Sequence, residues 1–159
     1  RVVLQQLDII EAEGYRADRF ISIHTQAEPD FGLNLAVAER GAWIEYDNIG
    51  WVEDAPLADR IMQALEAGKA TQLLLSHDAG WYDPAKPGGG TPKPFTHLSD
   101  VMLPLLRQRG ARDDTIRQLT VTNPFEAYAR WGGGCNEGRT GVHSTRTMPL
   151  PLVADAAQR

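Results

Sequence analysis

Three short runs of apolar residues, each ended by polar side chains, set the pattern of the first half of the chain. They lie at Phe20–His24, Trp43–Asp47 and Leu73–His77. A run of this length that stops at small or polar residues is typical of a strand buried on both faces of a sheet. The pattern therefore predicts three strands, with His24, Asp47 and the pair His77-Asp78 at their carboxyl ends.

Helical spacing separates these strands. Leu57, Ile61 and Leu65 form one apolar stripe that Gly68 ends, and a second helix is predicted from about residue 30 to 40. An amphipathic helix also opens the chain, before the first strand. Alternating strands and helices at these distances indicate βαβ crossovers, so the expected fold class is α/β with a parallel sheet and outer helices.

The second half begins with a long loop, 80–95, rich in Gly, Pro and aromatic residues. Helices are predicted after it, with a kink or a restart at Pro104 and with Asn123 as the N-cap of the last one. From residue 131 the pattern shows no period, and Gly and Pro are frequent. We expect a folded domain over 1–130 and a disordered tail over 131–159.

Composition narrows the function. The chain has 159 residues, enough for one domain with a core, and a net charge of -5, which argues against nucleic acid and anionic membranes as partners. Cys135 is the only cysteine, which excludes an internal disulfide and fits a reducing, cytoplasmic compartment. The chain opens at Arg1 inside a helix, so we expect a piece of a longer protein, and an export signal upstream stays open.

The strand ends carry the candidate chemistry. In a parallel barrel the carboxyl ends of the strands meet on one face, where His24, Asp47, His77 and Asp78 could come together. Imidazole and carboxylate groups suit a divalent metal such as zinc, which activates a bound water. Structural alternatives stay open: either histidine could serve only as a hydrogen-bond partner, and Asp47 could cap the following loop.

Aromatic residues on the loops form a second candidate group. Trp51, Trp81, Tyr82 and Phe95 could line an apolar pocket for a small organic substrate, or they could simply pack the loops onto the barrel. His97, at a predicted helix start, is expected to face solvent. Neighbouring residues on a strand cannot form a catalytic relay, which rules out Ser76-His77-Asp78 as a hydrolase triad.

Four segments together resemble the phosphotriesterase family of metal-dependent amidohydrolases. They are 20–28 (FISIHTQAE), 41–47 (GAWIEYD), 75–82 (LSHDAGWY) and 120–125 (TVTNPF). The first three are similar to the last three strands of that family's barrel, and the fourth to its closing helix. The resemblance implies that residues 1–130 form strands 6 to 8 of a (β/α)8 TIM barrel, the C-terminal part of a larger enzyme.

The resemblance also implies site residues. The family holds two divalent metals, expected here to be Zn²⁺, bridged by a hydroxide and a carboxylated lysine. His24 would be the metal-ligating histidine after the sixth strand, and Asp78 the metal ligand and proton acceptor after the eighth. His77 would support the site without ligating. Many members have an acid where this chain has Gln26, which removes the usual partner for proton transfer from Asp78.

The function implied is a hydrolase in which metal-bound hydroxide attacks a phosphotriester, a lactone or another ester, with a small-molecule ester as the partner. The chain alone is expected to be inactive, because the other ligands would lie before Arg1. A homodimer of the full-length parent stays open. The alternative is a non-catalytic, truncated barrel that acts as a binding or assembly partner.

Overall fold

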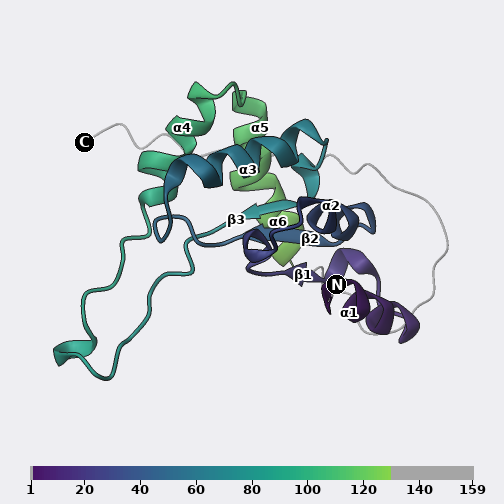
Figure 1. The fold of residues 1–159 in the computed structure, drawn as a ribbon, viewed down its shortest axis with the longest axis horizontal. Helices are drawn as coiled ribbons and strands as arrows, with labels where there is room; N and C mark the ends of the chain where they lie inside the picture. Colours follow the sequence, from purple (N-terminus) through teal and green to yellow (C-terminus); the bar gives the residue numbers. More distant parts are fainter. Residues whose placement is uncertain (1, 130–159) are drawn as a thin grey trace, which may run out of the picture.

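The three predicted strands form one parallel sheet in the order β1-β2-β3 (Figure 1). The computed structural model describes residues 2–129. Its strands are β1 (Ile21–Ser22), β2 (Trp43–Tyr46) and β3 (Leu73–Leu75). The parallel arrangement confirms the prediction. The first two strands are shorter than predicted, because His24 has a left-handed backbone and the Asp47 N–H bonds to the Gln26 side chain instead of to a strand.

Helices connect and cover the strands. The first three are α1 (Val2–Ala12), α2 (Phe31–Glu39) and α3 (Asp54–Glu66). Asp30 caps α2 by accepting a hydrogen bond from the Gly32 N–H at 2.9 Å. In Figure 1, α1 lies beside β1, and α2 lies next to α1 and β2.

The core lies between the sheet and these helices. Its fully buried side chains include Leu7, Ile44, Tyr46, Ile49, Ile61, Leu73, Met102, Leu106 and Leu119. Tyr46 points toward α2, where its hydroxyl donates to Asn34 Oδ1 at 2.9 Å. Side chains alternate along a strand, so Glu45 and Asp47 lie on the opposite face of β2.

In the last helices a π turn precedes each proline. A π turn, η5 (Leu98–Met102), runs into α4 (Leu103–Gln108), and after α5 (Asp113–Arg117) a second π turn, η6 (Gln118–Thr122), runs into α6 (Asn123–Tyr128). A proline ring clashes with the carbonyl four residues earlier in an α-helix. Each π turn shifts the preceding bond to the carbonyl five residues back, and at Pro104 the helix restarts as α4, one of the two outcomes predicted there.

Asn123 is not the predicted N-cap. Its backbone is helical, and its side-chain Nδ2 donates to the carbonyls of Ala70 and Leu73, each at 2.7 Å. Asn123 is fully buried. It therefore ties α6 to the start of β3 rather than opening a helix.

Two further short helical turns lie directly before strands, η1 (Ala17–Arg19) before β1 and η3 (Ala70–Gln72) before β3. The segment 79–96 leaves the body of the molecule as a long excursion, with the turn η4 (Pro87–Gly89) at its far end (Figure 1). Across residues 2–129 no helix combines the length and apolar character needed to span a membrane. The tail predicted over 131–159, with Cys135, lies outside the described residues.

Candidate active site at the carboxyl ends of the strands

The backbone marks two of the predicted site residues. Among residues 2–129, His24 and Asp78 are the only residues other than glycine with a positive φ, 53° and 44°. This left-handed region costs free energy for any side chain with a Cβ, and residues held there cluster at functional sites. Both residues follow parallel strands, β1 and β3, so they lie at the same end of the sheet.

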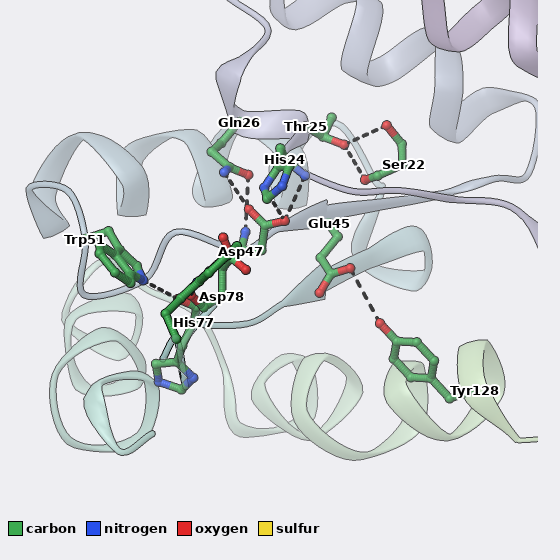
Figure 2. Close-up of polar contacts among 11 residues, drawn as sticks. Ser22, His24, Thr25, Gln26, Glu45, Asp47, Trp51, His77, Asp78 and Tyr128 are labelled. Carbon is green, nitrogen blue, oxygen red and sulfur yellow. Dashed lines mark hydrogen bonds and ion pairs between the residues drawn. The ribbon is translucent and has the colours of Figure 1, made fainter. Parts of the chain in front are cut away.

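Asp47 fixes His24. Its Oδ2 lies 2.8 Å from His24 Nδ1 and also accepts the His24 backbone N–H at 2.8 Å (Figure 2). The side chain of Asp47 is only 6% exposed, whereas that of His24 is 54% exposed. A buried carboxylate thus holds one edge of an accessible imidazole ring and determines which way the ring faces.

Gln26 completes this arrangement. Its Nε2 donates to Asp47 Oδ1 at 2.7 Å, and its Oε1 accepts the Asp47 backbone N–H at 3.2 Å. Gln26 lies in the turn η2 (Thr25–Ala27), which a hydrogen bond from Thr25 Oγ1 to the Ser22 carbonyl ties to β1. An amide cannot exchange a proton as a carboxylic acid does, so Gln26 here holds the carboxylate in place.

Electrostatics favour the protonated form of His24. The hydrogen bond to Asp47, and then the charge of Asp47, raise the pKa of His24 above its ordinary value of 6.5. The charges of Asp78 and Glu45 raise this pKa further. Asp78 is therefore near enough to act on the imidazole electrostatically, and a metal ion binding at His24 would compete with a proton.

Asp78 itself is exposed, and within the described part of the chain no hydrogen bond reaches its carboxylate. Its position is set through the backbone, because its carbonyl accepts the indole N–H of Trp81 at 2.8 Å. Figure 2 shows the Asp78 side chain beside Asp47, on the side away from the His77 ring. A carboxylate in this state is free to bind a cation or accept a proton.

His77 points away from this group. Its Nε2 accepts the Leu98 N–H at 2.8 Å, which satisfies an otherwise unpaired donor at the start of η5. Burial, and then the nearby His97, lower the pKa of His77 below 6.5. The ring therefore serves as a neutral acceptor that joins the end of β3 to the next helix.

The aromatic residues differ in their contacts. Trp51 donates its indole N–H to the His77 carbonyl at 2.6 Å, and its ring lies 3.9 Å from the ammonium of Lys93. Trp81 is 63% exposed. Tyr82 packs directly on Gly89, where an added Cβ would lie 2.2 Å from the ring.

His97 was predicted to face solvent, but its side chain is paired and partly buried. Its Nε2 lies 2.8 Å from Asp54 Oδ1 and its side chain is 29% exposed. A Cβ added to Gly50 would approach the His97 ring to 3.2 Å. His97 therefore joins the helix after the long loop to the start of α3.

Sequence reasoning missed two polar residues at this end of the sheet, Lys93 and Glu45, and it missed the contact of Gln26 with Asp47. Glu45 is 8% exposed and accepts a hydrogen bond from the Tyr128 hydroxyl at 3.5 Å. Burial, and then the charge of Glu45, raise the pKa of Tyr128. The one available signal was an acid within a buried strand, two residues before Asp47 and so on the same face.

The donors fit a divalent metal in kind and fall short in number. Between residues 2 and 129 no three His, Cys, Asp or Glu side chains gather closely enough to hold an ion. His24 and Asp78 supply one imidazole and one carboxylate at a common edge. A catalytic zinc site usually has at least three protein ligands, so others would have to come from outside these residues.

Comparisons with known proteins all match this chain to the same family. The model of the phosphotriesterase family matches residues 1–128. A phosphotriesterase homology protein of Mycobacterium tuberculosis is 28% identical over 138 residues, which cover 82% of this chain and 42% of that protein. A phosphotriesterase-related protein of Drosophila melanogaster is also 28% identical, covering 77% and 37%.

Solved structures agree. A resiniferatoxin-binding protein from Rhodobacter sphaeroides matches with a TM-score of 0.69 and 27% identity, over 80% of this chain and 38% of that one. The organophosphorus hydrolase from Deinococcus radiodurans matches with a TM-score of 0.67 and 30% identity, over 78% and 41%. The sheet and helices are thus the C-terminal part of a TIM barrel, as predicted, and the chain spans about two fifths of the length of the curated relatives it matches.

Proposed function

Because the chain belongs to the phosphotriesterase family, we propose that it forms one side of the active site of a metal-dependent ester hydrolase. The observation that carries this proposal is the left-handed backbone of His24 and Asp78. Residues with a Cβ that are held in this region cluster at functional sites, and between residues 2 and 129 these two strand ends are the only examples.

Two divalent metal ions, with zinc as the first candidate, would each take one ligand from this chain, His24 for one and Asp78 for the other. When bound, such ions supply Lewis acidity and lower the pKa of a coordinated water. The remaining ligands would belong to the part of the barrel that the relatives have in addition. By itself the chain would bind metal weakly and would not turn over substrate.

Asp47 and Gln26 would orient the imidazole. With Nδ1–H donated to Asp47 Oδ2 at 2.8 Å, the neutral ring keeps its lone pair on Nε2, the nitrogen left for a metal. Gln26 keeps the carboxylate from rotating, through its bond to Asp47 Oδ1. The ligand would therefore be preorganised before any ion arrives.

Asp78 would accept the proton of the attacking water. Its carboxylate is exposed, and no hydrogen bond within the described residues occupies it. No acid lies beside it in the η2 turn, because Gln26 stands there and is committed to Asp47. The proton would therefore pass from Asp78 to solvent rather than to a second side chain.

The substrate would be a phosphotriester, a lactone or another ester. The exposed rings of Trp51 and Trp81, next to Asp78, suit an apolar group on such a molecule. Similar structures include the organophosphorus hydrolase and one from the engineering of organophosphate hydrolysis in a weak promiscuous lactonase template. Both reactions place an electrophilic centre opposite a nucleophilic oxygen.

A non-catalytic binding role is the second candidate. It is favoured by the lack of a three-ligand cluster among residues 2–129. The two candidates differ in what Asp78 does, because only a hydrolase needs its carboxylate to take a proton.

The test is Asp78→Asn in the protein that contains this chain together with the rest of the barrel. The amide has nearly the same size but cannot take the proton, so turnover of a phosphotriester and a lactone should fall by about 10²–10⁴-fold at matched metal content. Asp100→Asn is the matched control, since among the described residues the only hydrogen bond of that exposed side chain is with its neighbour Ser99. Activity of Asp78→Asn within a few-fold of the control would exclude the hydrolase proposal.

A further inference from the structure

A cavity of about 360 Å³ lies between the loop after β2 and the long excursion after β3. Trp51 and Trp81 contribute its aromatic surface, and Lys86, Lys93 and Asp83 contribute its charged groups. It is large enough for a ring with a short substituent. Its lining comes from two loops that leave adjacent parallel strands on the side of the candidate active site.

The two indoles tie this cavity to Asp78. Trp51 donates its N–H to the His77 carbonyl at 2.6 Å, and Trp81 donates to the Asp78 carbonyl at 2.8 Å. Both N–H groups are thus used by the backbone that carries Asp78. Lys93 lies over one face of the Trp51 ring, and the remaining surface of the two rings is exposed. A flat apolar group bound in the cavity would therefore lie beside the segment that presents the catalytic carboxylate.

The charges around the cavity do not cancel. Lys86 lies 3.3 Å from Asp83 Oδ2, and this pair is neutral as a whole. Lys93 has no carboxylate partner among the described residues. Its Nζ donates to the Gly50 carbonyl at 2.7 Å and lies 3.9 Å from the Trp51 ring.

Lys93 is therefore a half-buried cation with unused donors, in a protein whose net charge is -5. An ammonium has three N–H donors, and the Gly50 carbonyl takes one of them. The contact with Trp51 places the charge over one face of that ring. A negative oxygen at this point would gain a charge-assisted hydrogen bond without displacing a protein carboxylate.

We propose that this cavity binds a small aromatic or apolar group that bears an oxyanion, a carboxylate or a phosphate, with Lys93 as the residue that selects the charge. The proposal rests on the proposed function and deepens it, since it names the substrate class. The preferred substrate is an ester or lactone whose ring lies on Trp51 and Trp81 and whose anionic substituent reaches Lys93.

The test measures binding directly, on the protein that contains this chain together with the rest of the barrel, stripped of metal with a chelator and dialysed. Benzoate and benzamide are a matched pair that differ in charge and little in shape, and phenyl phosphate tests the second oxyanion. The readout is the shift of the Trp51 and Trp81 indole N–H signals in ¹H–¹⁵N spectra, assigned with Trp51→Phe and Trp81→Phe. Benzoate should bind about five- to tenfold more tightly than benzamide, the gain of one charge-assisted hydrogen bond.

Lys93→Met keeps the length of the side chain and removes its charge, so it should abolish the preference while benzamide binding changes little. Lys69→Met is the matched control, because Lys69 lies elsewhere and pairs with Glu39. The dissociation constants from titrations with benzoate and phenyl phosphate then say which oxyanion is preferred.

An undiminished benzoate preference in Lys93→Met would overturn the proposal, as would the absence of any shift at the two indoles. Neither result depends on hydrolysis. If the binding experiment fails, the hydrolase proposal can still be tested with Asp78→Asn. If the Asp78→Asn test fails, the measured preference for benzoate remains valid.

Discussion

The two strand ends that frame the candidate site are held by different means. At the end of β1 the contacts are made by side chains. The Asp47 carboxylate binds both the backbone N–H and the ring of His24, and it accepts a further hydrogen bond from the Gln26 amide. At the end of β3, side chains from the loops hold the backbone, through the carbonyls of His77 and Asp78. His24 is thus fixed at its ring, whereas Asp78 is fixed at its main chain and keeps a free carboxylate.

This difference fits the two tasks proposed for these residues. A metal ligand benefits from a fixed direction and a defined tautomer, which a buried carboxylate provides. A group that must take up and release a proton benefits from exposure and from having no competing hydrogen bond. One edge of a parallel sheet can offer both because each strand continues into its own loop.

The largest expected effect that separates the two ends is on stability. Asp47→Asn places an amide N–H₂ among three donors and removes a buried charge, which should lower the free energy of unfolding by about 2–3 kcal/mol. Asp78→Asn is the matched change at the other end, where no hydrogen bond is lost within the described residues, and should stay within about 0.5 kcal/mol. Urea denaturation of both variants measures the difference.

Equal losses in the two variants would contradict the comparison, because they would mean that the Asp47 contacts add nothing to stability. Asp78→Asn also links stability to activity. It should leave the fold intact while removing the proton acceptor, so a loss of turnover in this variant cannot be ascribed to unfolding.

Local pattern was enough to predict the sheet. The strands end where Phe20–His24, Trp43–Asp47 and Leu73–His77 change from apolar to polar, and a parallel arrangement follows from the helices between them. His24 and Asp78 were placed at the correct edge for the same reason. Their proposed roles stay a prediction, since they came from family resemblance rather than from spacing.

Contacts between distant residues could not be predicted in this way. Gln26 reaches Asp47 across 21 positions and Asn123 reaches Leu73 across 50, and neither pair leaves a periodic signal. Asn-Pro is the usual start of a helix, but a π turn can also accommodate the proline, and burial of Asn123 decided the outcome. His97 was misassigned because its partner, Asp54, lies 43 positions away.

A second, smaller effect tests the backbone strain. Asp78→Gly removes the Cβ from a residue at φ 44°, and no hydrogen bond of the side chain is lost, so the free energy of unfolding should rise by about 0.5–1 kcal/mol. His24→Gly also relieves strain at φ 53° but loses the ring contact with Asp47. The two glycine variants should therefore change stability in opposite directions, as measured by thermal unfolding at fixed pH.

A gain in both variants would show that the ring contact with Asp47 is weaker than the strain at His24. A loss in both would show that Asp78 is not strained. Gly14→Ala serves as the reference, because Gly14 has φ 84° with open space around it, and an alanine there meets backbone strain alone.

The smallest effect is electrostatic and has opposite signs at the two ends. The hydrogen bond and charge of Asp47 raise the pKa of His24 above 6.5, whereas burial and then His97 lower the pKa of His77 below it. The contribution of His24 to stability is therefore complete below pH 6.5 and is lost as the pH rises through its raised pKa. The contribution of His77 is complete above pH 6.5 and is lost as the pH falls through its lowered pKa.

In metal-free protein, the ring C–H signals in ¹H–¹³C spectra should titrate on opposite sides of 6.5, assigned with His24→Gln and His77→Gln. Asp47→Asn should bring the His24 midpoint back toward 6.5 and leave that of His77 unchanged. Midpoints on the same side of 6.5, or a His77 midpoint that follows the Asp47 substitution, would mean that the two strand ends share one electrostatic environment, contrary to the contacts described above.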